Sequence, residues 1–412
     1  MRNQIITGLD LGTSHIRIAV CQRGEENSNS LQIIGLAEFP TQGISKGIIT
    51  SIEDTVSSIT AALEQVEKIT GLSVENCFVG VSGSHISANL GKGVVAVSRV
   101  NGEIEEEDVS RAIEAARSVG IPPNKEILHI IPKSFIVDGQ SAIKDPLGMT
   151  GIRLEVETMI IEGASSQIKN LTKCVYRTGL NIEDLIYTAL GASEAVLTPR
   201  QKELGVAIVD IGASNTNLAV FEAGELIHTA VLPIGSDHIT ADIAIGLRID
   251  LDSAEKIKRK SGCAASSDID KKEEINLADY GIEDNISVSR KYLARIIEAR
   301  VEEIFEKVNV ELQKIERAGM LPAGAVLTGG GAKLAGLVDQ AKQNLRLPAR
   351  IGRIEKAESV LDKTQDPSFA TSIGLAIWGN QMMEGHEDRG FDLRNLKDGI
   401  KRFGKWLKSL RP

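Results

Sequence analysis

The sequence has few cysteines and lacks any long apolar run. Its four cysteines, Cys21, Cys77, Cys174 and Cys263, are widely separated and form no CxxC pair. This argues against a disulfide framework or a zinc knuckle and favours a reducing compartment. The sequence contains no run of about 18 apolar residues, the length that spans a bilayer. A strand is expected almost at the N-terminus, in QIITGLD, which leaves no room for a signal peptide. We therefore expect a cytosolic body that is not an integral membrane protein.

Strong compositional bias is also absent. The chain has 412 residues, of which 42% are hydrophobic and 25% charged, so it is neither disordered nor fibrous and is long enough for two domains. The net charge is −9, but residues 394–412 carry seven Lys or Arg against one Asp, and this +6 leaves −15 for the rest. An acidic body disfavours binding to nucleic acid, and a short basic tail indicates an anionic surface as its target.

What the sequence does contain is an internal repeat. The segment GLDLGTSHIRIAVCQRGE, which ends at Glu25, aligns without a gap with IVDIGASNTNLAVFEAGE, which ends at Glu225. The alignment places Asp10 on Asp210, Gly12 on Gly212 and Ser14 on Ser214, as three matched pairs. Each copy predicts a strand, a tight glycine-containing turn with hydroxyl side chains, and a returning strand. Two such turns that face each other could grip one phosphate chain from both sides.

The residue types in the repeated turn suit phosphate chemistry. Asp10 stands at a strand end, Gly12 allows backbone amides to approach an anion closely, and Thr13 and Ser14 add hydroxyls. A carboxylate at this position also suits a hydrated Mg²⁺ ion. One such turn is as typical of a plain hairpin as of a phosphate site. The second copy, over 210–216, favours the functional interpretation.

A third motif, LTGGGAKL at 327–334, places three glycines at the end of an expected strand. We expect these glycines to open a helix, so that the backbone lies flat against a nucleoside and the helix N-terminus faces phosphate. A glycine triplet alone is usually just a turn. After two phosphate turns in this order, it predicts a nucleoside-binding loop.

The remaining pattern predicts a layered α/β fold. Three strands lead to a helix at about 52–69, and short strands around one amphipathic helix predict an inserted subdomain at about 83–161. Residues 167–197 are expected to form helix, strand and helix. Helices are expected from 236 to about 317, interrupted by the polar stretch SGCAASSDIDKKEEINLADYG, which predicts an exposed connection. The globular part is expected to close near Trp378, and EGHEDRG predicts a polar linker.

These three motifs in this order resemble those of the actin, Hsp70 and sugar-kinase ATPase superfamily over residues 5–380. The likeness to the FtsA family of bacterial cell-division proteins covers essentially the whole chain. It is carried by GLDLGTSHIRIAV, by SGSHIS at 82–87, by IIPKSFIVDGQSAIKDPLGMTGIRL at 130–154, and by KELGVAIVDIGASNTNLAVFEAGELIHTAVLPIGSDHITADIA at 202–244.

The resemblance implies an actin-like fold in which two lobes close over ATP and Mg²⁺. With the pattern above, it divides the chain into a lobe 1 core (1–82 and 163–203), an inserted subdomain (83–162), a lobe 2 core (204–235), a lobe 2 outer subdomain (236–310), a closing segment with the nucleoside loop (311–380), a linker (381–393) and an amphipathic membrane-targeting helix (394–412). It implies that Asp10 and Asp210 position Mg²⁺ through water. The other nucleotide-binding residues that it implies are Gly12, Thr13, Ser14, Gly212, Ala213, Ser214, Asn215, Gly235, Glu255, Lys258, Gly329, Gly330, Gly331 and Lys333.

Glu255 and Lys258 have a second interpretation. The helix LDSAEKIKRKSG begins with an Asp252-x-x-Glu255 pattern that predicts capping. The resemblance places Glu255 and Lys258 beside the ribose and base. A Glu and a Lys three residues apart on a helix are, however, commonly a solvated pair that contributes only a few tenths of a kcal/mol.

Two departures from the superfamily pattern predict slow or absent ATP turnover. The second phosphate turn of the superfamily usually reads DxGGGT, whereas here Gly212 is followed by Ala213, Ser214 and Asn215, which predicts looser contact with phosphate. Actin relatives that hydrolyse ATP carry a Gln or Glu before the second turn, and LIYTALGASEAVL offers only Glu194, out of register.

The basic tail predicts a short amphipathic helix. Its apolar residues recur every three or four positions and its cations lie on the other side. The apolar stripe comprises Leu396, Ile400, Phe403, Leu407 and Leu410, flanked by Trp406, and the cations are Lys397, Lys401, Arg402, Lys405 and Lys408. Such a helix is too short and too charged to span a bilayer and instead predicts reversible binding to anionic lipid. The alternative is that it docks on the body of the chain or on a partner protein.

The sequence thus predicts an ATP-binding, actin-like cell-division protein at the cytoplasmic face of the membrane. The resemblance implies that it forms filaments with itself, that it binds the C-terminal tail of the tubulin-like protein FtsZ through 236–310, and that later division proteins bind the insert. The helix VSRKYLARIIEARVEEIFEKVNVEL supplies cations that could meet acidic groups or lie on a solvated face: Arg290, Lys291, Arg295 and Arg300. The alternatives are a small-molecule kinase of the same superfamily and a pilus-assembly adaptor of the PilM type.

Overall fold

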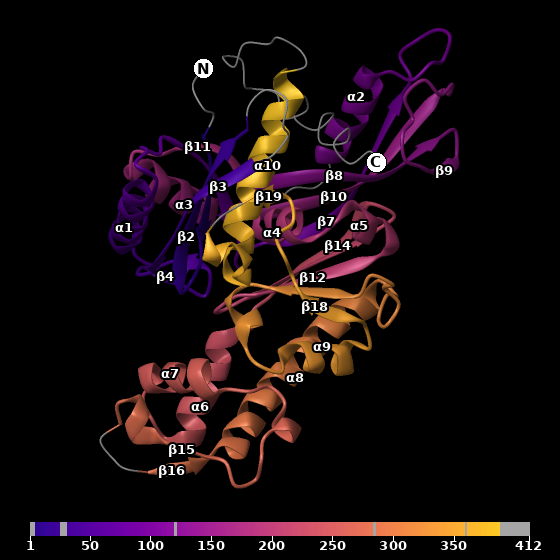
Figure 1. Ribbon diagram of the computed structural model, residues 1–412. Coiled ribbons are helices and arrows are strands. Elements are labelled where there is room, and N and C mark those ends of the chain that lie inside the picture. The colour runs from indigo at the N-terminus through magenta and orange to yellow at the C-terminus, as the bar shows by residue number, and fades with distance from the viewer. Residues whose placement is uncertain (1–4, 25–30, 119–121, 283–285, 359–360, 388–412) are drawn as a thin grey trace.

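The computed structural model describes residues 5–24, 31–118, 122–282, 286–358 and 361–387. The predicted α/β class is confirmed: two lobes, an insert and an outer helical part are arranged along the molecule (Figure 1). The predicted membrane helix at 394–412 lies outside the described residues. In the part of the chain that is described, no helix combines the length and the apolar character needed to cross a membrane.

Lobe 1 is built on a six-stranded sheet with the strand order β11-β6-β1-β2-β3-β19. The first three strands form an antiparallel meander, and β6 and β11 continue the sheet parallel to β1. The strands are β1 (Ile5–Leu11), β2 (His15–Arg23), β3 (Leu31–Pro40), β6 (Asn76–Val81), β11 (Asn181–Tyr187) and β19 (Ala357–Glu358), and a separate small hairpin is formed by β4 (Ile44–Ser45) and β5 (Ile48–Ile49).

Helices cover this sheet on both sides: α1 (Ile52–Thr70), α3 (Ser165–Arg177), α4 (Thr188–Val196) and α10 (Ala370–Glu387), followed in the first crossover to lobe 2 by α5 (Pro199–Leu204). The helix predicted at 52–69 is confirmed as α1. It begins where the Ser51 hydroxyl accepts a hydrogen bond from the Asp54 amide, and it ends at Gly71 in the left-handed conformation.

Lobe 2 repeats the arrangement of lobe 1. Its sheet has the order β14-β13-β12-β17-β18, which is the lobe 1 order β3-β2-β1-β6-β11 strand for strand. Its strands are β12 (Val206–Ile211), β13 (Thr216–Glu222), β14 (Glu225–Leu232), β17 (Ala325–Thr328) and β18 (Ala349–Ile351). The sequence repeat is therefore the trace of two equivalent sheets.

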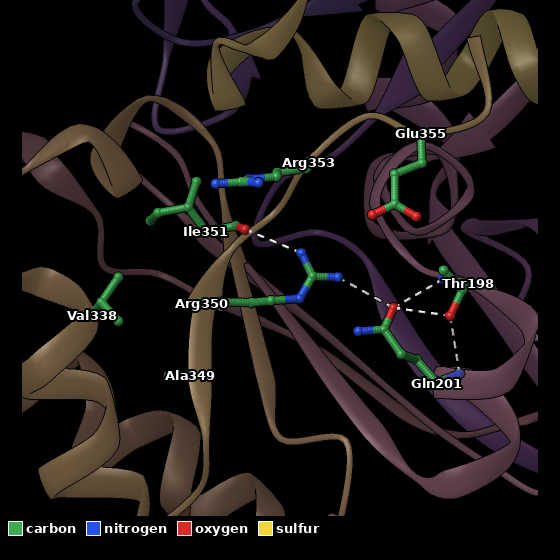
Figure 2. A pocket seen from close by; sticks show the side chains of 8 residues that line it. All are labelled: Thr198, Gln201, Val338, Ala349, Arg350, Ile351, Arg353 and Glu355. Carbon is green, nitrogen blue, oxygen red and sulfur yellow. Dashed lines mark hydrogen bonds between the residues drawn. The ribbon is translucent and has the colours of Figure 1, made fainter.

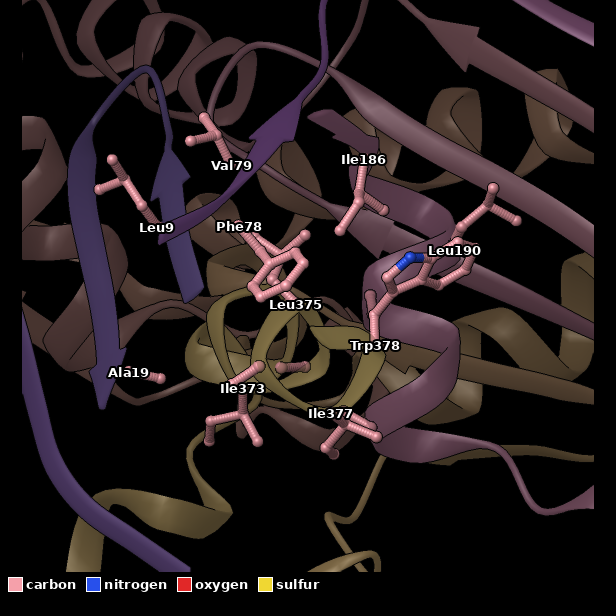
Figure 3. Packing of buried hydrophobic residues seen from close by; sticks show 14 of the residues in the cluster. Leu9, Ala19, Phe78, Val79, Ile186, Leu190, Ile373, Leu375, Ile377 and Trp378 are labelled. Carbon is pink, nitrogen blue, oxygen red and sulfur yellow. The ribbon is translucent and has the colours of Figure 1, made fainter. Parts of the chain in front are cut away.

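The lobe 1 core is closed by α10, which runs along the sheet and packs against β1 and α4 (Figures 1 and 3). Figure 3 shows Leu375 and Trp378 of this helix against Phe78 and Ile186 of the sheet, all of them buried. A segment near the C-terminus of the described chain is thus required to complete a core that begins in the first strand.

The insert folds as predicted, with strands around one helix. Its sheet has the order β7-β10-β8-β9 and carries α2 on one face. The elements are β7 (Ser87–Ala96), α2 (Glu106–Arg117), β8 (Lys125–Val137), β9 (Gln140–Ile143) and β10 (Arg153–Ala164). A Cβ atom at Gly93 would lie 1.9 Å from the Ala112 carbonyl oxygen, so only glycine allows α2 to sit this close to β7.

The insert also contacts lobe 2. Strands β7, β8 and β10 all lie against β14. The Lys144 ammonium donates a hydrogen bond to the Ala223 carbonyl at 2.7 Å and lies 3.7 Å from the Glu203 carboxylate. The insert therefore arises from lobe 1 and rests on lobe 2.

The outer part of lobe 2 holds most of its helices. They are α6 (Ser236–Leu247), α7 (Leu251–Ser261) and α8 (Arg290–Lys314), with α9 (Leu337–Leu345) beside the sheet.

The polar stretch after 260 is not the exposed connection that the sequence predicted. The polar stretch contains a strand, β15 (Glu274–Asn276), that pairs with β16 (Ser287–Ser289). It also buries Cys263, Ile269 and Leu277. These apolar residues are too irregularly spaced to form a recognisable period, which is why the prediction was wrong.

Candidate functional site

The two repeated turns occupy equivalent places in the two lobes. Residues 12–14 connect β1 to β2, and residues 212–215 connect β12 to β13. The strand registers set Asp10 opposite Arg17 and Asp210 opposite Asn217. Each carboxylate therefore lies at the end of a buried strand, beside its own turn, with a different polar partner.

Hydrogen bonds link lobe 1 to lobe 2 beside the two turns. The Ser82 hydroxyl of lobe 1 donates to Asn217 Oδ1 at 2.8 Å, and Asn217 Nδ2 donates to Asp210 Oδ2 at 3.1 Å. On the other side, the Gly47 amide donates to Thr13 Oγ1 at 3.1 Å, and Asn215 Nδ2 donates to the Lys46 carbonyl at 3.5 Å. The turns thus face the same cleft from opposite lobes.

The two aspartates are electrostatically coupled. Burial raises the pKa of Asp10 to about 7, with Arg17 opposing the rise and Asp210 adding to it. Burial also raises the pKa of Asp210, against the hydrogen bond from Asn217 and the charge of Arg17. Arg17 itself is oriented by Glu38, at 3.5 Å, and by the ring of Phe369. Two carboxyls that resist ionisation together would gain from a cation between them.

Backbone donors are available at both turns. In the described part of the chain, no acceptor is recorded for the amides of Thr13, Ser14, Ala213 and Ser214. Carbonyl groups of the turns, by contrast, are hydrogen-bonded within the protein. Thr41 Oγ1 donates to the Gly12 carbonyl, and the Gly212 amide donates to the Asn215 carbonyl. Amides in such a turn form an anion site.

The glycine loop lies against the second turn, and the helix that the sequence predicted there is a single 3₁₀ turn, Gly330–Lys333. Gly329 has φ +84°, and a Cβ there would lie 2.4 Å from Asp210 Oδ1. A Cβ on Gly331 would collide with Ile211, whereas one on Gly330 would meet nothing within 4 Å. Gly330 therefore presents bare, exposed backbone. Lys333 is held by Asp366, at 2.6 Å.

The helix that carries Glu255 and Lys258 lies beside the same cleft. Its N-cap is Asp250, which accepts from the Ser253 amide, so the predicted capping role of Asp252 is wrong by two residues. Lys258 is buried and donates to the Ser236 carbonyl and to Thr240 Oγ1, at 3.1 and 2.8 Å, and lies 2.5 Å from Glu255. The pair is therefore not simply a solvated one.

The start of α6 lies against the second turn. The Asp237 amide donates to the Ala213 carbonyl, and a Cβ on Gly235 would lie 2.5 Å from the same oxygen. Burial raises the pKa of Asp237, with Lys258 opposing. Across the cleft, burial lowers the pKa of His15, and among the charges that act on this ring is Glu255. Hence α7 faces the first turn as well.

Glu194 does not face this cleft as a free carboxylate. It is buried, 2.5 Å from Lys202 Nζ and 3.0 Å from Lys356 Nζ, and it accepts from Gln381 Nε2 at 3.1 Å. Its pKa is well below the usual range because these two lysines outweigh the cost of burial. It serves to join α4, α5 and α10, and it is not poised to activate water.

Sequence reasoning missed several members of the cleft. Arg17 and Asn217 occupy the same position in the two copies of the repeat, so extending the comparison past the turns would have found them. Ser82, Lys46 and Gly47 come from other parts of lobe 1, and no sequence spacing indicated that they meet lobe 2. Of the candidate residues, Gly329 lies beside Asp210 and Gly235 beside Ala213, while Lys333 forms an ion pair with Asp366; their part in nucleotide binding stays a prediction.

The comparisons with known proteins agree with this geometry. The family model described as "Cell division protein FtsA" matches residues 207–374, and that described as "SHS2 domain inserted in FTSA" matches 83–162. The chain is 40% identical to the cell division protein FtsA of Bacillus subtilis, over 90% of this chain and 83% of that one. It is 36% identical to the FtsA of Borreliella burgdorferi, over 100% of this chain and 98% of that one.

Solved structures with similar folds have much lower identity. The PilM-PilN type IV pilus biogenesis complex matches with a TM-score of 0.67 and 17% identity, over 91% of this chain and 98% of that one. MreB5 of Spiroplasma citri bound to ADP matches with a TM-score of 0.55 and 14% identity, over 94% and 99%. At this identity the likeness concerns the actin-like fold alone.

Proposed function

Since this chain belongs to the FtsA family of cell division proteins, we propose that it binds ATP and Mg²⁺ between its lobes, polymerises on the cytoplasmic membrane at the division site and anchors FtsZ there. The observation that supports the nucleotide part is the link between the two repeated turns: the Gly47 amide donates to Thr13 Oγ1 of the first turn, and Asn215 Nδ2 of the second turn donates to the Lys46 carbonyl. Two turns linked in this way could bind one phosphate chain from both sides.

The residues present fit a magnesium nucleotide. Asp10 and Asp210 would hold hydrated Mg²⁺ through water, because Mg²⁺ dehydrates reluctantly and usually keeps several waters beside one or two carboxylates. The open amides of 13–14 and 213–214 would take phosphate oxygens. The exposed backbone of Gly330 would lie under the nucleoside, with Glu255 and Lys258 at the ribose and base. Bound Mg²⁺ would neutralise phosphate charge and relieve the coupling of the two aspartates.

The same geometry favours a protein whose conformation depends on bound nucleotide over an enzyme that turns ATP over rapidly. Glu194, which the sequence offered before the second turn, is held between two lysines. A small-molecule kinase would need a free carboxylate toward its substrate. We therefore expect nucleotide to set the lobe arrangement, with little turnover.

The outer part of lobe 2 is our proposed site for the acidic tail of FtsZ. At the start of α8, Tyr292 is 49% exposed, and Ile245 of the neighbouring α6 is 76% exposed. Of the four cations on this helix, Arg295 is exposed, whereas Arg290, Lys291 and Arg300 bond to groups of the chain itself. An apolar patch with one accessible arginine suits an amphipathic peptide that carries acidic residues.

Electron microscopy on an anionic lipid monolayer tests the proposal as a whole. We expect filaments of the full-length chain with Mg-ATP and none from a chain that ends at Asp392, because the basic tail would supply the lipid contact. If neither chain assembles and the full-length chain does not reach the lipid, the membrane filament is wrong. A PilM-like adaptor would instead bind a membrane-protein peptide and not the FtsZ tail.

Nucleotide binding is tested separately by titration with a fluorescent ATP analogue. Asp210→Asn should weaken binding at least tenfold, and Asp279→Asn, an exposed carboxylate of the outer part, is the matched control. Equal affinities of wild type and Asp210→Asn would contradict the site. Binding of an FtsZ-tail peptide should likewise weaken in Arg295→Glu and remain in Lys307→Glu, whose lysine lies further along the same helix.

A further inference from the structure

A hollow of about 700 Å³ lies outside the nucleotide cleft (Figure 2). The chain passes between the lobes twice, at 197–205 and at 351–357, and residues of both crossovers line the hollow. Its lining comprises Thr198, Gln201, Val338, Ala349, Arg350, Ile351, Arg353 and Glu355. A ligand here would therefore touch both connections about which the lobes turn.

The hollow follows the free edge of a sheet. Strand β18 is the last strand of the lobe 2 sheet and pairs only with β17 in the described chain. Its lining residues come from both faces of the strand: Figure 2 shows Arg350 pointing to one side and Ile351 to the other. A hollow bounded by both faces of an edge strand has the shape that an added strand would fill.

The backbone of β18 retains bonding capacity on this edge. The Pro348 carbonyl and the Gly352 amide both bond to β17, at 2.7 and 2.8 Å. Because alternate residues of a strand point the same way, the amides of Ala349 and Ile351 face the hollow. The Ile351 carbonyl accepts from Arg350 Nη1 at 3.2 Å. The Ala349 amide and carbonyl can therefore exchange two hydrogen bonds with one residue of an antiparallel peptide, and the Ile351 amide can donate a third.

The side chains around this edge favour a negatively charged ligand. Gln201 Oε1 already accepts from Arg350, Thr198 N and Thr198 Oγ1, which leaves the Gln201 amide NH₂ as a donor. Arg353 is exposed and lies above the edge (Figure 2). One carboxylate, Glu355, stands against these donors, at the far side of the hollow from Val338. Val338, Ala349 and Ile351 supply an apolar wall.

We propose that this hollow, the β18 edge site, binds an extended peptide segment of a partner protein in which acidic residues alternate with apolar ones. Its backbone pairs with Ala349 and Ile351, its acidic side chains lie toward Arg353 and Gln201, and its apolar side chains lie on Ile351 and Val338.

The test uses the full chain and a fluorescein-labelled peptide in which glutamate and valine alternate, with binding read by anisotropy. We expect saturable binding that weakens at least tenfold in Arg353→Glu. Lys342→Glu, which reverses an exposed cation on α9 outside the hollow, should change the affinity less than twofold. A peptide N-methylated at alternate residues cannot pair with the strand and should not bind. Circular dichroism of the variants confirms that they are folded.

Three results would overturn the proposal. Failure of the wild type to bind the peptide at millimolar concentration is one, and equal binding by Arg353→Glu is another. Equal binding of the N-methylated peptide would mean that general charge attraction, and not pairing with β18, holds the peptide. None of these readouts involves nucleotide, lipid or filaments, so the β18 edge site and the proposed function succeed or fail independently.

Discussion

Asp10 is the side chain whose charge depends most on what occupies the nucleotide cleft. Burial raises its pKa to about 7, so near neutral pH it is half protonated when the cleft holds no cation. A water-mediated Mg²⁺ contact requires the carboxylate, and binding must release the proton. We expect the affinity for the magnesium nucleotide to rise about tenfold from pH 6 to pH 8.

The control for this prediction is Asp10→Asn, which cannot titrate. It should bind more weakly than the wild type at pH 8 and show little pH dependence. A flat wild-type profile between these values, measured by calorimetry, would show that Asp10 is not linked to nucleotide binding.

Glu194 is a second carboxylate whose role is decided by its neighbours, here as a structural residue. In Glu194→Gln the buried ammonium of Lys202 loses its counter-charge, which destabilises by about 3–5 kcal/mol when one partner of a buried pair is removed. Urea unfolding should show this loss. Glu203→Gln, at a largely exposed position, should change the free energy of unfolding by less than about 0.5 kcal/mol. A variant of Glu194 that kept full stability but lost ATP turnover would instead identify a catalytic residue.

At the scale of elements, a buried histidine of β8 makes a polar link between the insert and the lobe 1 core. His129 Nε2 accepts from the Tyr187 amide at 3.0 Å, and its ring packs edge-on against Trp378. Burial lowers the pKa of His129 to about 4, from 6.5. The unfolded chain therefore binds the extra proton between these values, and the free energy of unfolding falls as pH drops through that window, by up to about 3 kcal/mol.

His129→Gln tests this contribution, because glutamine offers an acceptor without a titrating ring. Unfolding of the wild type, followed by tryptophan fluorescence, should lose more stability between pH 6.5 and pH 4 than that of the variant. Parallel pH profiles would mean that other groups account for the acid sensitivity.

The sequence predicted the elements well wherever a regular period or the repeat carried the signal. Strands β1 to β3 of the first sheet, β12, β13 and β17 of the second, α1, α2 and the order of helix and strand at 167–197 follow from spacing and turn chemistry. The segment after 260 was mistaken for a loop, because its buried Cys263, Ile269 and Leu277 follow neither helical nor strand spacing. The helix expected after the glycines is a short 3₁₀ turn, Gly330–Lys333.

The site was predictable to the extent that it is duplicated. Asp10, Asp210 and their turns were identified from their alignment, and Gly329 from the strand before it. Contacts between distant segments could not be predicted, since Ser82 and Asn217, or Glu194 and Lys356, are related by tertiary packing alone. The spacing of residues could not show that three separate motifs belong to one nucleotide site. That expectation came from the resemblance of the whole chain to the FtsA family.

At the scale of the whole molecule, Lys144 adds a polar contact to the packing of the insert on lobe 2. Lys144→Ala removes a bond to the Ala223 carbonyl and the attraction to Glu203. We expect faster hydrogen exchange in β9 and in the turn between β13 and β14, because this joint opens more often. Lys169→Ala, which removes an exposed ion pair with Glu126 on the other side of the insert, is the matched control. Unchanged exchange in Lys144→Ala would mean that packing against β14 is sufficient to hold the insert.

The seating of the insert on β14 has a mechanical consequence. Because the insert is rooted in lobe 1 and rests on lobe 2, a partner that pulled on it would exert torque on the angle between the lobes. On the proposed function, a nucleotide bound between the lobes would resist that torque. The dwell time of the nucleotide would then vary with the load on the insert, and a subunit under tension and a slack subunit would exchange nucleotide at different rates.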